Sequence, residues 1–476
     1  WGWAEAGEDI TVSFAGQSKL AKAEEDGTWM VKLDAMEASA EARAFTVNTV
    51  TFTNVVVGEV WLCSGQSNME WPLTRAINSK QEIADAKYPL IRLVTTPRKH
   101  SAVPRQDLSL KWTSCTPASI PNFSAVGYFF GRKLQQELDV PIGLINSSWG
   151  GTKVEPWTPP EGFRLVPELK SISDKVDVLL PGSETAKLAN QKLIDAVKAW
   201  VTAAEADVLA GKHPAALPTA VEKLSGHQAA TMIYNEKIHP IVPYTLRGAI
   251  WYQGESNGAE GMPYFHKKKA LIEGWRKVWD QDIAFYFVQL ADYRKPNTDP
   301  KGGDGWAKLR EAQRLTLTLP HTGMAVITDI GNGGNIHPAN KQDVGHRLAL
   351  WALAKDYGQS ELVHSGPLYK SHTVSSNEIH VAFNHIGSGL MAGIRKEGLE
   401  PTAEAPDGVL KHFAIAGADK VWAWADGSIE GDKVVLSAKT VDAPVAVRYA
   451  FATNPSGANL YNKEGLPASP FRTDDW

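Results

Sequence analysis

Residues 61–71 read WLCSGQSNMEW, and an apolar, strand-like run from Val55 to Leu62 leads into them. The run stops abruptly in small and polar residues, so Ser67 lies just past the end of a strand that we expect to be buried. Two interpretations compete for such a position. It can be a turn that happens to be polar, or it can present a nucleophile at the edge of a sheet. The surrounding sequence has to decide between them.

Apolar, strand-like runs alternate with helical stretches from about residue 58 to residue 358. The predicted strands are 58–63, 91–95, 142–147, 247–252, 283–290 and 323–329, and the predicted helices are 123–139, 262–280, 306–319 and 340–357. This order predicts an α/β fold with a parallel sheet that is covered by helices on both faces. Functional residues of such sheets collect in the loops at the carboxyl ends of the strands. The loop that contains Ser67 is one of these.

Two or three domains are expected in the 476 residues, since one ordinary core does not grow to this size. Residues 1–57 alternate in polarity and predict a small N-terminal β-domain, which we expect to be truncated at its start. Residues 58–358 would be the α/β domain, with a helical insertion at about 160–235 because a structureless loop of that length is uncommon. Residues 359–476 predict a C-terminal β-sandwich or jelly-roll-like domain. The strands expected in the two β-domains are 10–16, 28–36, 45–57, 378–385, 412–417, 433–438 and 445–452.

The composition disfavours several classes of partner. The net charge is −4, which does not favour nucleic acid or an anionic membrane surface. No apolar run approaches the roughly 20 residues that span a bilayer. The 17 Trp residues are expected mostly in the core, although exposed Trp also stacks on sugar rings. The chain begins at Trp1 with neither an initiator Met nor a signal peptide, so we expect that a leader was removed.

Neither a metal nor a cofactor is expected. Cys63 and Cys115 do not have the spacing of a zinc site, and they form either one disulfide or two buried thiols. The sequence contains no HExxH, Walker A or Rossmann fingerprint. Residues 331–335, GNGGN, are glycine-rich but lack the spacing of a dinucleotide-binding loop.

Three further segments are polar, contain glycine and follow a predicted strand, as the segment around Ser67 does. The first is INSSWGGTKVEPW (145–157), where Gly150 and Gly151 can bring backbone N–H groups close to a ligand. Taken alone, two glycines after a strand are more often a simple turn.

The second is AIWYQGESN (249–257), which offers three polar side chains. Gln253 can donate a side-chain N–H to an oxyanion, Glu255 can orient a histidine, and Asn257 supplies another amide. The alternative is a polar loop that caps the next helix.

The third is DIGNGGNIHPANKQDVGHRLAL (329–350), where His337 lies in a loop between a predicted strand and a predicted helix. Pro338 stiffens this loop, and a histidine in such a place is a candidate general base. His346 falls inside the predicted helix, where a surface or packing role is more common.

The four segments are more informative together than any one of them alone. Because each follows a parallel strand, they should converge at one edge of the sheet. They would bring a nucleophile, oxyanion donors, an acid and a base to that edge, which is the set that acyl transfer requires.

The sequence resembles the sialate O-acetylesterase family, within the SGNH (GDSL-like) hydrolases. The matching stretches are GEVWLCSGQSNMEWPL (58–73), GLINSSWGGTKVEPW (143–157), RGAIWYQGESN (247–257), IHPANKQDVGHRLAL (336–350) and LPASPFRTDDW (466–476). The resemblance covers nearly the whole chain. It implies a flavodoxin-like, three-layer SGNH-hydrolase domain between the two β-domains. It also implies a periplasmic or secreted serine esterase that removes acetyl groups from sugar hydroxyls.

The resemblance also assigns roles to individual residues. Ser67 would be the nucleophile and His337 the base that deprotonates it. The oxyanion hole would consist of the Ser67 N–H, the N–H of Gly151 or Gly150, and the Gln253 side chain. The reaction would pass through an acetyl-enzyme on Ser67, which water then hydrolyses.

The chain departs from the SGNH pattern at one position of the triad. These hydrolases usually place an acid two or three residues before the histidine, where this sequence has Asn335 and Gly334. Either Glu255 orients His337, or the enzyme uses a Ser–His dyad in which Asn335 or a backbone carbonyl fixes the imidazole. We favour Glu255, since a carboxylate fixes the tautomer and stabilises the imidazolium. Asp329 is a weaker candidate.

The sequence leaves the substrate open. The family name points to an O-acetylated sialic acid, whose carboxylate would need a cation such as Arg75 or Lys153, but an acetylated plant polysaccharide such as xylan is an alternative. Because the expected acid before His337 is missing, a non-catalytic carbohydrate-binding protein on the same scaffold is a further alternative.

Overall fold

A seven-stranded sheet forms the centre of the computed structural model, which describes residues 1–219, 225–396 and 398–476. The strand order is β13-β12-β11-β7-β10-β8-β9, and all neighbours are parallel except β9, which runs antiparallel to β8. The bounds are β7 (Glu59–Gly65), β8 (Tyr88–Thr95), β9 (Thr113–Cys115), β10 (Ile142–Ser148), β11 (Gly248–Tyr252), β12 (Ala284–Val288) and β13 (Thr322–Ala325). All six predicted strands of this domain are confirmed, and with them the α/β fold class.

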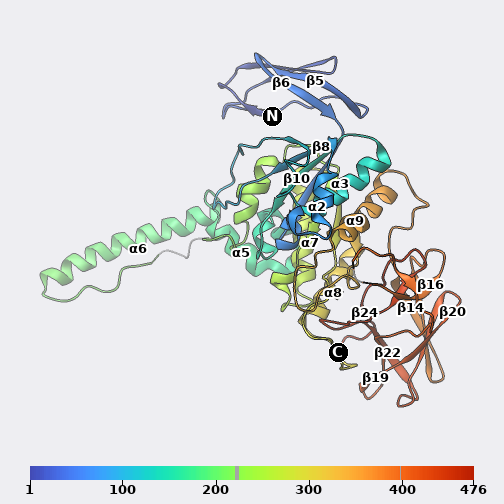
Figure 1. The fold of residues 1–476 in the computed structure, drawn as a ribbon. Coiled ribbons are helices and arrows are strands. Elements are labelled where there is room, and N and C mark those ends of the chain that lie inside the picture. Colours follow the sequence, from blue (N-terminus) through green and yellow to red (C-terminus); the bar gives the residue numbers. More distant parts are fainter. Residues whose placement is uncertain (220–224, 397) are drawn as a thin grey trace.

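Helices cover both faces of the sheet (Figure 1). α3 (Ala125–Leu138) and α9 (Lys341–Asp356) pack on one face, and α7 (Tyr264–Trp279) and α8 (Gly305–Leu315) pack on the other. Within β7, Trp61 and Cys63 belong to the first core while Leu62 belongs to the second. This is why the strand reads as a continuous apolar run rather than an alternating one.

The central position of β7 determines where the functional loops meet. β7 lies between β10 and β11, and the register pairs Gly65 with Ser148 on one side and with Tyr252 on the other. The three strands therefore end at the same level. Gly65 has φ +135, and a Cβ atom there would lie 2.2 Å from the carbonyl oxygen of Tyr252, so only glycine fits.

The N-terminal strands form a separate sheet of order β3-β2-β5-β6, at the top of Figure 1. Its strands are β2 (Asp9–Phe14), β3 (Gln17–Lys22), β5 (Ser39–Val47) and β6 (Val50–Val57). The prediction of one strand over 45–57 is wrong, because Asn48 turns the chain in the left-handed conformation (φ 47) and divides it into β5 and β6. The predicted strand 28–36 is reduced to the short β4 (Thr28–Trp29), which pairs with β1 (Gly2–Trp3).

The C-terminal region consists of antiparallel strands around a third core. Its four predicted strands correspond to β15 (Glu378–Asn384), β18 (Phe413–Gly417), β21 (Lys433–Ser437) and β22 (Pro444–Tyr449). The sequence did not indicate β14 (Leu368–Ser375), β16 (Leu390–Ile394), β17 (Ala403–Glu404), β19 (Trp422–Trp424), β20 (Asp426–Glu430), β23 (Leu460–Asn462) and β24 (Phe471–Arg472).

Helices fill the long connection between β10 and β11. They are α4 (Pro160–Leu165), α5 (Lys170–Leu179) and α6 (Glu184–Leu209), and α6 projects away from the body of the molecule (Figure 1). Residues 220–224 of the predicted insertion lie outside the described residues.

The two cysteines are free and buried, so of the two alternatives the structure has the thiols. Trp61, Trp157, Trp251 and Trp275 are among the largest fully buried side chains, as expected for a core role. No helix within the described ranges is both long and apolar enough to cross a membrane.

Candidate active site

Ser67 and His337 meet at the carboxyl edge of the sheet. Ser67 is the first residue of α1 (Ser67–Glu70), directly after β7, and His337 lies in the loop between β13 and α9. The Nε2 atom of His337 lies 2.8 Å from the Oγ atom of Ser67, although 270 positions separate the two residues in the sequence. A neutral imidazole with its proton on Nδ1 can accept the hydroxyl proton in this geometry.

Stacking and the loop backbone hold the imidazole of His337. The ring stacks on the indole of Trp71, with 5.1 Å between centroids and 19° between planes. The Asn335 side chain accepts a hydrogen bond from the backbone N–H of His337 (2.9 Å), so Asn335 orders the loop rather than the ring. Burial, followed by the positive charges of Lys341 and Arg75, lowers the pKa of His337 below its ordinary value. The histidine is therefore ready to act as a base.

Glu255 is close to the site but does not contact the imidazole. Its Oε1 atom accepts a hydrogen bond from Asn68 Nδ2 at 2.5 Å, and no hydrogen bond in the described part of the chain joins Glu255 to His337. The expected direct contact is thus absent: Asn68 binds one carboxylate oxygen, and the other, Oε2, has no partner among the described residues. Asp329 is not an alternative, since it forms a two-pronged ion pair with Arg347 (2.6 and 2.7 Å).

The glycine turn after β10 lies beside the serine. A Cβ atom on Gly150 would be 3.2 Å from the Cβ atom of Ser67, so a side chain there would crowd the nucleophile. The N–H of Gly150 donates to Glu70 Oε2 at 2.8 Å. Gly151 has φ +77, and its carbonyl accepts from Gln228 Nε2 at 2.7 Å. The N–H of Ser67 is at the first position of a helix, where no intrahelical acceptor exists.

The Gln253 amide does not face the serine as an open donor. Both of its N–H groups are used, one toward the carbonyl of Thr152 (3.2 Å) and one toward Asn257 Oδ1 (2.7 Å). The Tyr264 hydroxyl donates to its carbonyl oxygen (2.8 Å). Asn257 also accepts from the backbone N–H of Val154 (3.1 Å). These two predicted site residues therefore support the segment that follows the glycine turn, and Gln253 has no free N–H for an oxyanion.

The sequence reasoning missed three residues around the dyad. Asn68 and Trp71 lie in the same segment as Ser67, and Lys341 is the first residue of α9, four positions after His337. Their position beside the nucleophile and the base was the available signal.

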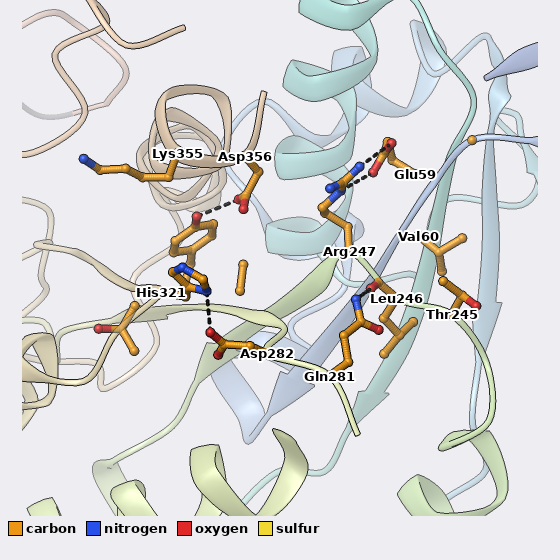
Figure 2. A pocket seen from close by; sticks show the side chains of 14 residues that line it. Glu59, Val60, Thr245, Leu246, Arg247, Gln281, Asp282, His321, Lys355 and Asp356 are labelled. Carbon is orange, nitrogen blue, oxygen red and sulfur yellow. Dashed lines mark hydrogen bonds and ion pairs between the residues drawn. The ribbon is translucent and has the colours of Figure 1, made fainter. Parts of the chain in front are cut away.

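The two reactive side chains do not line the large cavity of the molecule. A cavity of about 830 Å³ lies at the opposite, amino edge of the sheet and is lined by Glu59, Arg247 and neighbouring residues (Figure 2). Among the described residues, no group of three or more His, Cys, Asp or Glu side chains is arranged to hold a metal ion.

Known proteins resemble this chain in sequence and in fold. No protein-family model matches the chain. Sialate O-acetylesterase of Mus musculus is 32% identical over 411 residues, which are 78% of this chain and 72% of that protein. Sialate O-acetylesterase of Homo sapiens is 30% identical over 413 residues, 77% of this chain and 69% of that protein.

A solved structure agrees with these relatives. The crystal structure of a carbohydrate acetylesterase from Xanthomonas citri matches with a TM-score of 0.80 and 35% identity, over 100% of this chain and 95% of that one. By sequence and by fold, the chain belongs to the sialate O-acetylesterase family of ester hydrolases.

Proposed function

We propose that this protein is a serine O-acetylesterase that removes acetyl groups from sugar hydroxyls, with Ser67 as nucleophile and His337 as general base. The observation that carries the proposal is the 2.8 Å contact between His337 Nε2 and Ser67 Oγ at the carboxyl edge of the sheet. A hydroxyl beside a neutral imidazole is the arrangement that activates a serine.

The proposed reaction has two halves. In the first, His337 takes the Ser67 proton while Oγ attacks the acetyl carbonyl carbon, and the tetrahedral intermediate collapses to an acetyl-enzyme. The protonated His337 then gives its proton to the departing sugar oxygen. In the second half, His337 takes a proton from water, the hydroxide attacks the acetyl carbon, and acetate leaves as Ser67 recovers its proton.

The developing oxyanion needs N–H donors next to Ser67. The N–H of Ser67 itself is one, and the positive end of α1 supports it. The N–H of Gly151 is the second, because it has no acceptor among the described residues whereas the N–H of Gly150 is bound to Glu70.

The dyad works without a carboxylate on the imidazole. Burial, and after it the charges of Lys341 and Arg75, lowers the pKa of His337, and this favours the unprotonated imidazole in the resting enzyme. Glu255 lies behind Asn68, to which it is hydrogen-bonded, and does not contact the imidazole.

The cations near the dyad favour an acetylated sugar that carries a carboxylate. Arg75 is exposed, has no acidic partner among the described residues, and lies 5.5 Å from the Trp71 ring that stacks on His337. Lys153, the other candidate, is paired with Glu260 at 3.1 Å. We therefore infer that an O-acetylated sialic acid is the substrate and that Arg75 binds its carboxylate.

Acetate release from two substrates tests this function. Wild type and Ser67→Ala are assayed side by side on an O-acetylated sialic acid and on an acetylated xylan fragment. We expect turnover by wild type, faster on the sialic acid, and none by the variant. Equal turnover by both proteins would remove Ser67 from the mechanism, and faster turnover of xylan would reassign the substrate. Binding of either sugar without any acetate release would support the binding-protein alternative.

A further inference from the structure

The side-chain amide of Asn68 is saturated with hydrogen bonds. Its Nδ2 atom donates to Glu255 Oε1 (2.5 Å) and to the backbone carbonyl of Ile336 (3.0 Å). Its Oδ1 atom accepts from Lys341 Nζ. A lysine can only donate and a carboxylate can only accept, so these partners fix which end of the amide is which. Asn68 is fully buried.

The same amide joins the two backbones that carry the dyad. Asn68 directly follows Ser67 at the start of α1, and Ile336 directly precedes His337 in its loop. The Nδ2 to Ile336 bond therefore ties the base to the nucleophile through one short side chain. Catalysis is sensitive to such distances, because a shift of about 1 Å in a reacting group can cost about 100-fold in rate.

Two opposite charges flank the amide. Lys341 is fully buried and Glu255 is half-buried in this network, and no ion pair within 4.0 Å joins them in the described residues. Burial raises the pKa of Glu255 and lowers that of Lys341, while the charge of each partner opposes the shift of the other. Asn68 lies between Glu255 and Lys341 and forms a hydrogen bond with each. The two charged groups do not contact one another, so Asn68 supplies the polar contact that each of them needs.

Lys341 also reaches the aromatic side of the site. Its Nζ atom lies 5.6 Å from the centroid of Trp71, the ring that stacks on His337, and 5.1 Å from the centroid of Tyr252. Lys341 thus approaches the support of His337 in two ways: through Asn68, which binds the loop backbone at Ile336, and through its position near the Trp71 indole.

We propose that Asn68 is a positioning residue of this active site, and that it acts with Glu255 and Lys341 as a charge-balanced clamp that holds His337 against Ser67. The inference rests on the proposed dyad and goes further. Glu255 influences His337 through Asn68 and the Ile336 carbonyl, and it is not a third member of a triad.

Asn68→Asp tests the clamp with the smallest change in shape. The aspartate has no N–H for Ile336, and it places a second carboxylate against Glu255. We expect kcat for acetate release to fall about 100-fold while KM changes less than about threefold, since the substrate-binding groups are untouched. The thermal midpoint should fall as well.

A second variant distinguishes two effects of Asn68→Asp: the lost positioning of His337 and the changed charge balance. In the double variant Asn68→Asp/Glu255→Gln, the glutamine can donate to the aspartate, and a single carboxylate again faces Lys341. The hydrogen bond to Ile336 is still missing. We expect the thermal midpoint to recover most of its loss while kcat stays low. Recovery of kcat together with stability would assign the whole effect to charge balance and overturn the proposal.

Asn462 provides a matched control. It is fully buried in the C-terminal region, donates to the carbonyls of Ser365 (3.0 Å) and His385 (3.3 Å), and accepts from the N–H of Leu466 (2.9 Å). Asn462→Asp should lower the thermal midpoint and leave kcat unchanged below the unfolding range. If Asn68→Asp behaves in the same way, Asn68 is only structural and the proposal is wrong.

The same assay separates this proposal from the proposed function. Ser67→Ala is included in each series. If Ser67→Ala retains turnover, the dyad itself fails; if Ser67→Ala is inactive and Asn68→Asp keeps a normal kcat, only the clamp fails.

Discussion

At the amino edge of the central sheet, charged side chains line a cavity of about 830 Å³ and pair with one another (Figure 2). Arg247 donates twice to Glu59 (2.7 and 3.1 Å), and the Tyr286 hydroxyl donates to Asp356 (2.6 Å). His321 lies 2.8 Å from Asp282. At the carboxyl edge, where Ser67 and His337 meet, the polar groups are less completely paired.

Three buried groups near the dyad make no hydrogen bond in the described structure: Glu255 Oε2, the Tyr252 hydroxyl and Trp71 Nε1. Unsatisfied buried polar atoms are rare in folded proteins and are costly. Such atoms also occur elsewhere in the described chain, but here three of them lie close to the dyad, whereas the charges named at the amino edge are paired, and this difference distinguishes the two edges. The volume of a cavity does not make that distinction here.

Each edge contains a histidine. Replacing each of them by alanine in turn gives the largest expected difference in kcat. His337→Ala should lower kcat by about 1,000-fold or more, because Ser67 then has no base. His321→Ala should leave kcat within about twofold, since the His321 side chain pairs with Asp282 at the far edge. Steady-state acetate release from both variants checks this. A large loss in His321→Ala would show that the edges are coupled.

Arg75 sharpens the comparison, because it is a cation at the reactive edge that has no acidic partner within the described ranges. Arg75→Gln should lower kcat/KM for an O-acetylated sialic acid by about 10-fold, the effect of losing one charge-assisted contact. Activity on a neutral acetylated sugar should change less than about twofold. Lys153→Gln is the matched control, because Lys153 is already paired with Glu260. An equal loss of kcat/KM on both sugars would mean that Arg75 does not bind the carboxylate.

The acid limb of the pH profile tests the electrostatics of the same edge. Only neutral His337 can accept the serine proton, and its pKa lies below the ordinary 6.5, so activity should persist below pH 6.5 and be lost as the pH falls through the lowered pKa. Lys341, with a pKa of about 7, is mostly protonated in that range. Its charge opposes the imidazolium, as that of Arg75 does.

Lys341→Met should therefore raise the pKa of His337 and move the acid limb of kcat/KM to higher pH. The measurement is the pH dependence of kcat/KM for wild type and variant in the same buffers. Lys355→Met is the control from the amino edge, where Lys355 lines the cavity and is far from the dyad. If the acid limb of kcat/KM does not move in Lys341→Met, the charge of Lys341 does not affect the pKa of His337.

The sequence was sufficient for the sheet and for the dyad, but not for the contacts around it. Trp61, Leu62 and Cys63 form an unbroken apolar run because both faces of β7 are buried, and such a run can be recognised without coordinates. Ser67 and His337 follow strands of the same parallel sheet, so topology alone predicted that they converge.

The role of an amide depends on neighbours that the local sequence does not contain. Gln253 was a plausible oxyanion donor until the structure placed Thr152 and Asn257 against its two N–H groups. Glu255 was a plausible partner of His337, but in the structure it binds the Asn68 side chain instead. Thr152 and Asn68 come from segments that are far from Gln253 and Glu255 in the chain, and no periodicity of the sequence encodes such contacts.

The smallest expected effect belongs to the amino edge. Arg247→Met removes one ion pair that is partly exposed, and Glu59 keeps its hydrogen bond from the Tyr357 hydroxyl (3.0 Å). An ion pair of this kind contributes about 1 kcal/mol or less, so the thermal midpoint should fall by roughly 1–2 °C. The kcat and KM values should equal those of wild type, because Glu59 begins β7 whereas Ser67 follows its opposite end, so the ion pair lies a full strand away from the nucleophile. If kcat falls in this variant, the ion pair sets the position of β7 and the amino edge takes part in catalysis after all.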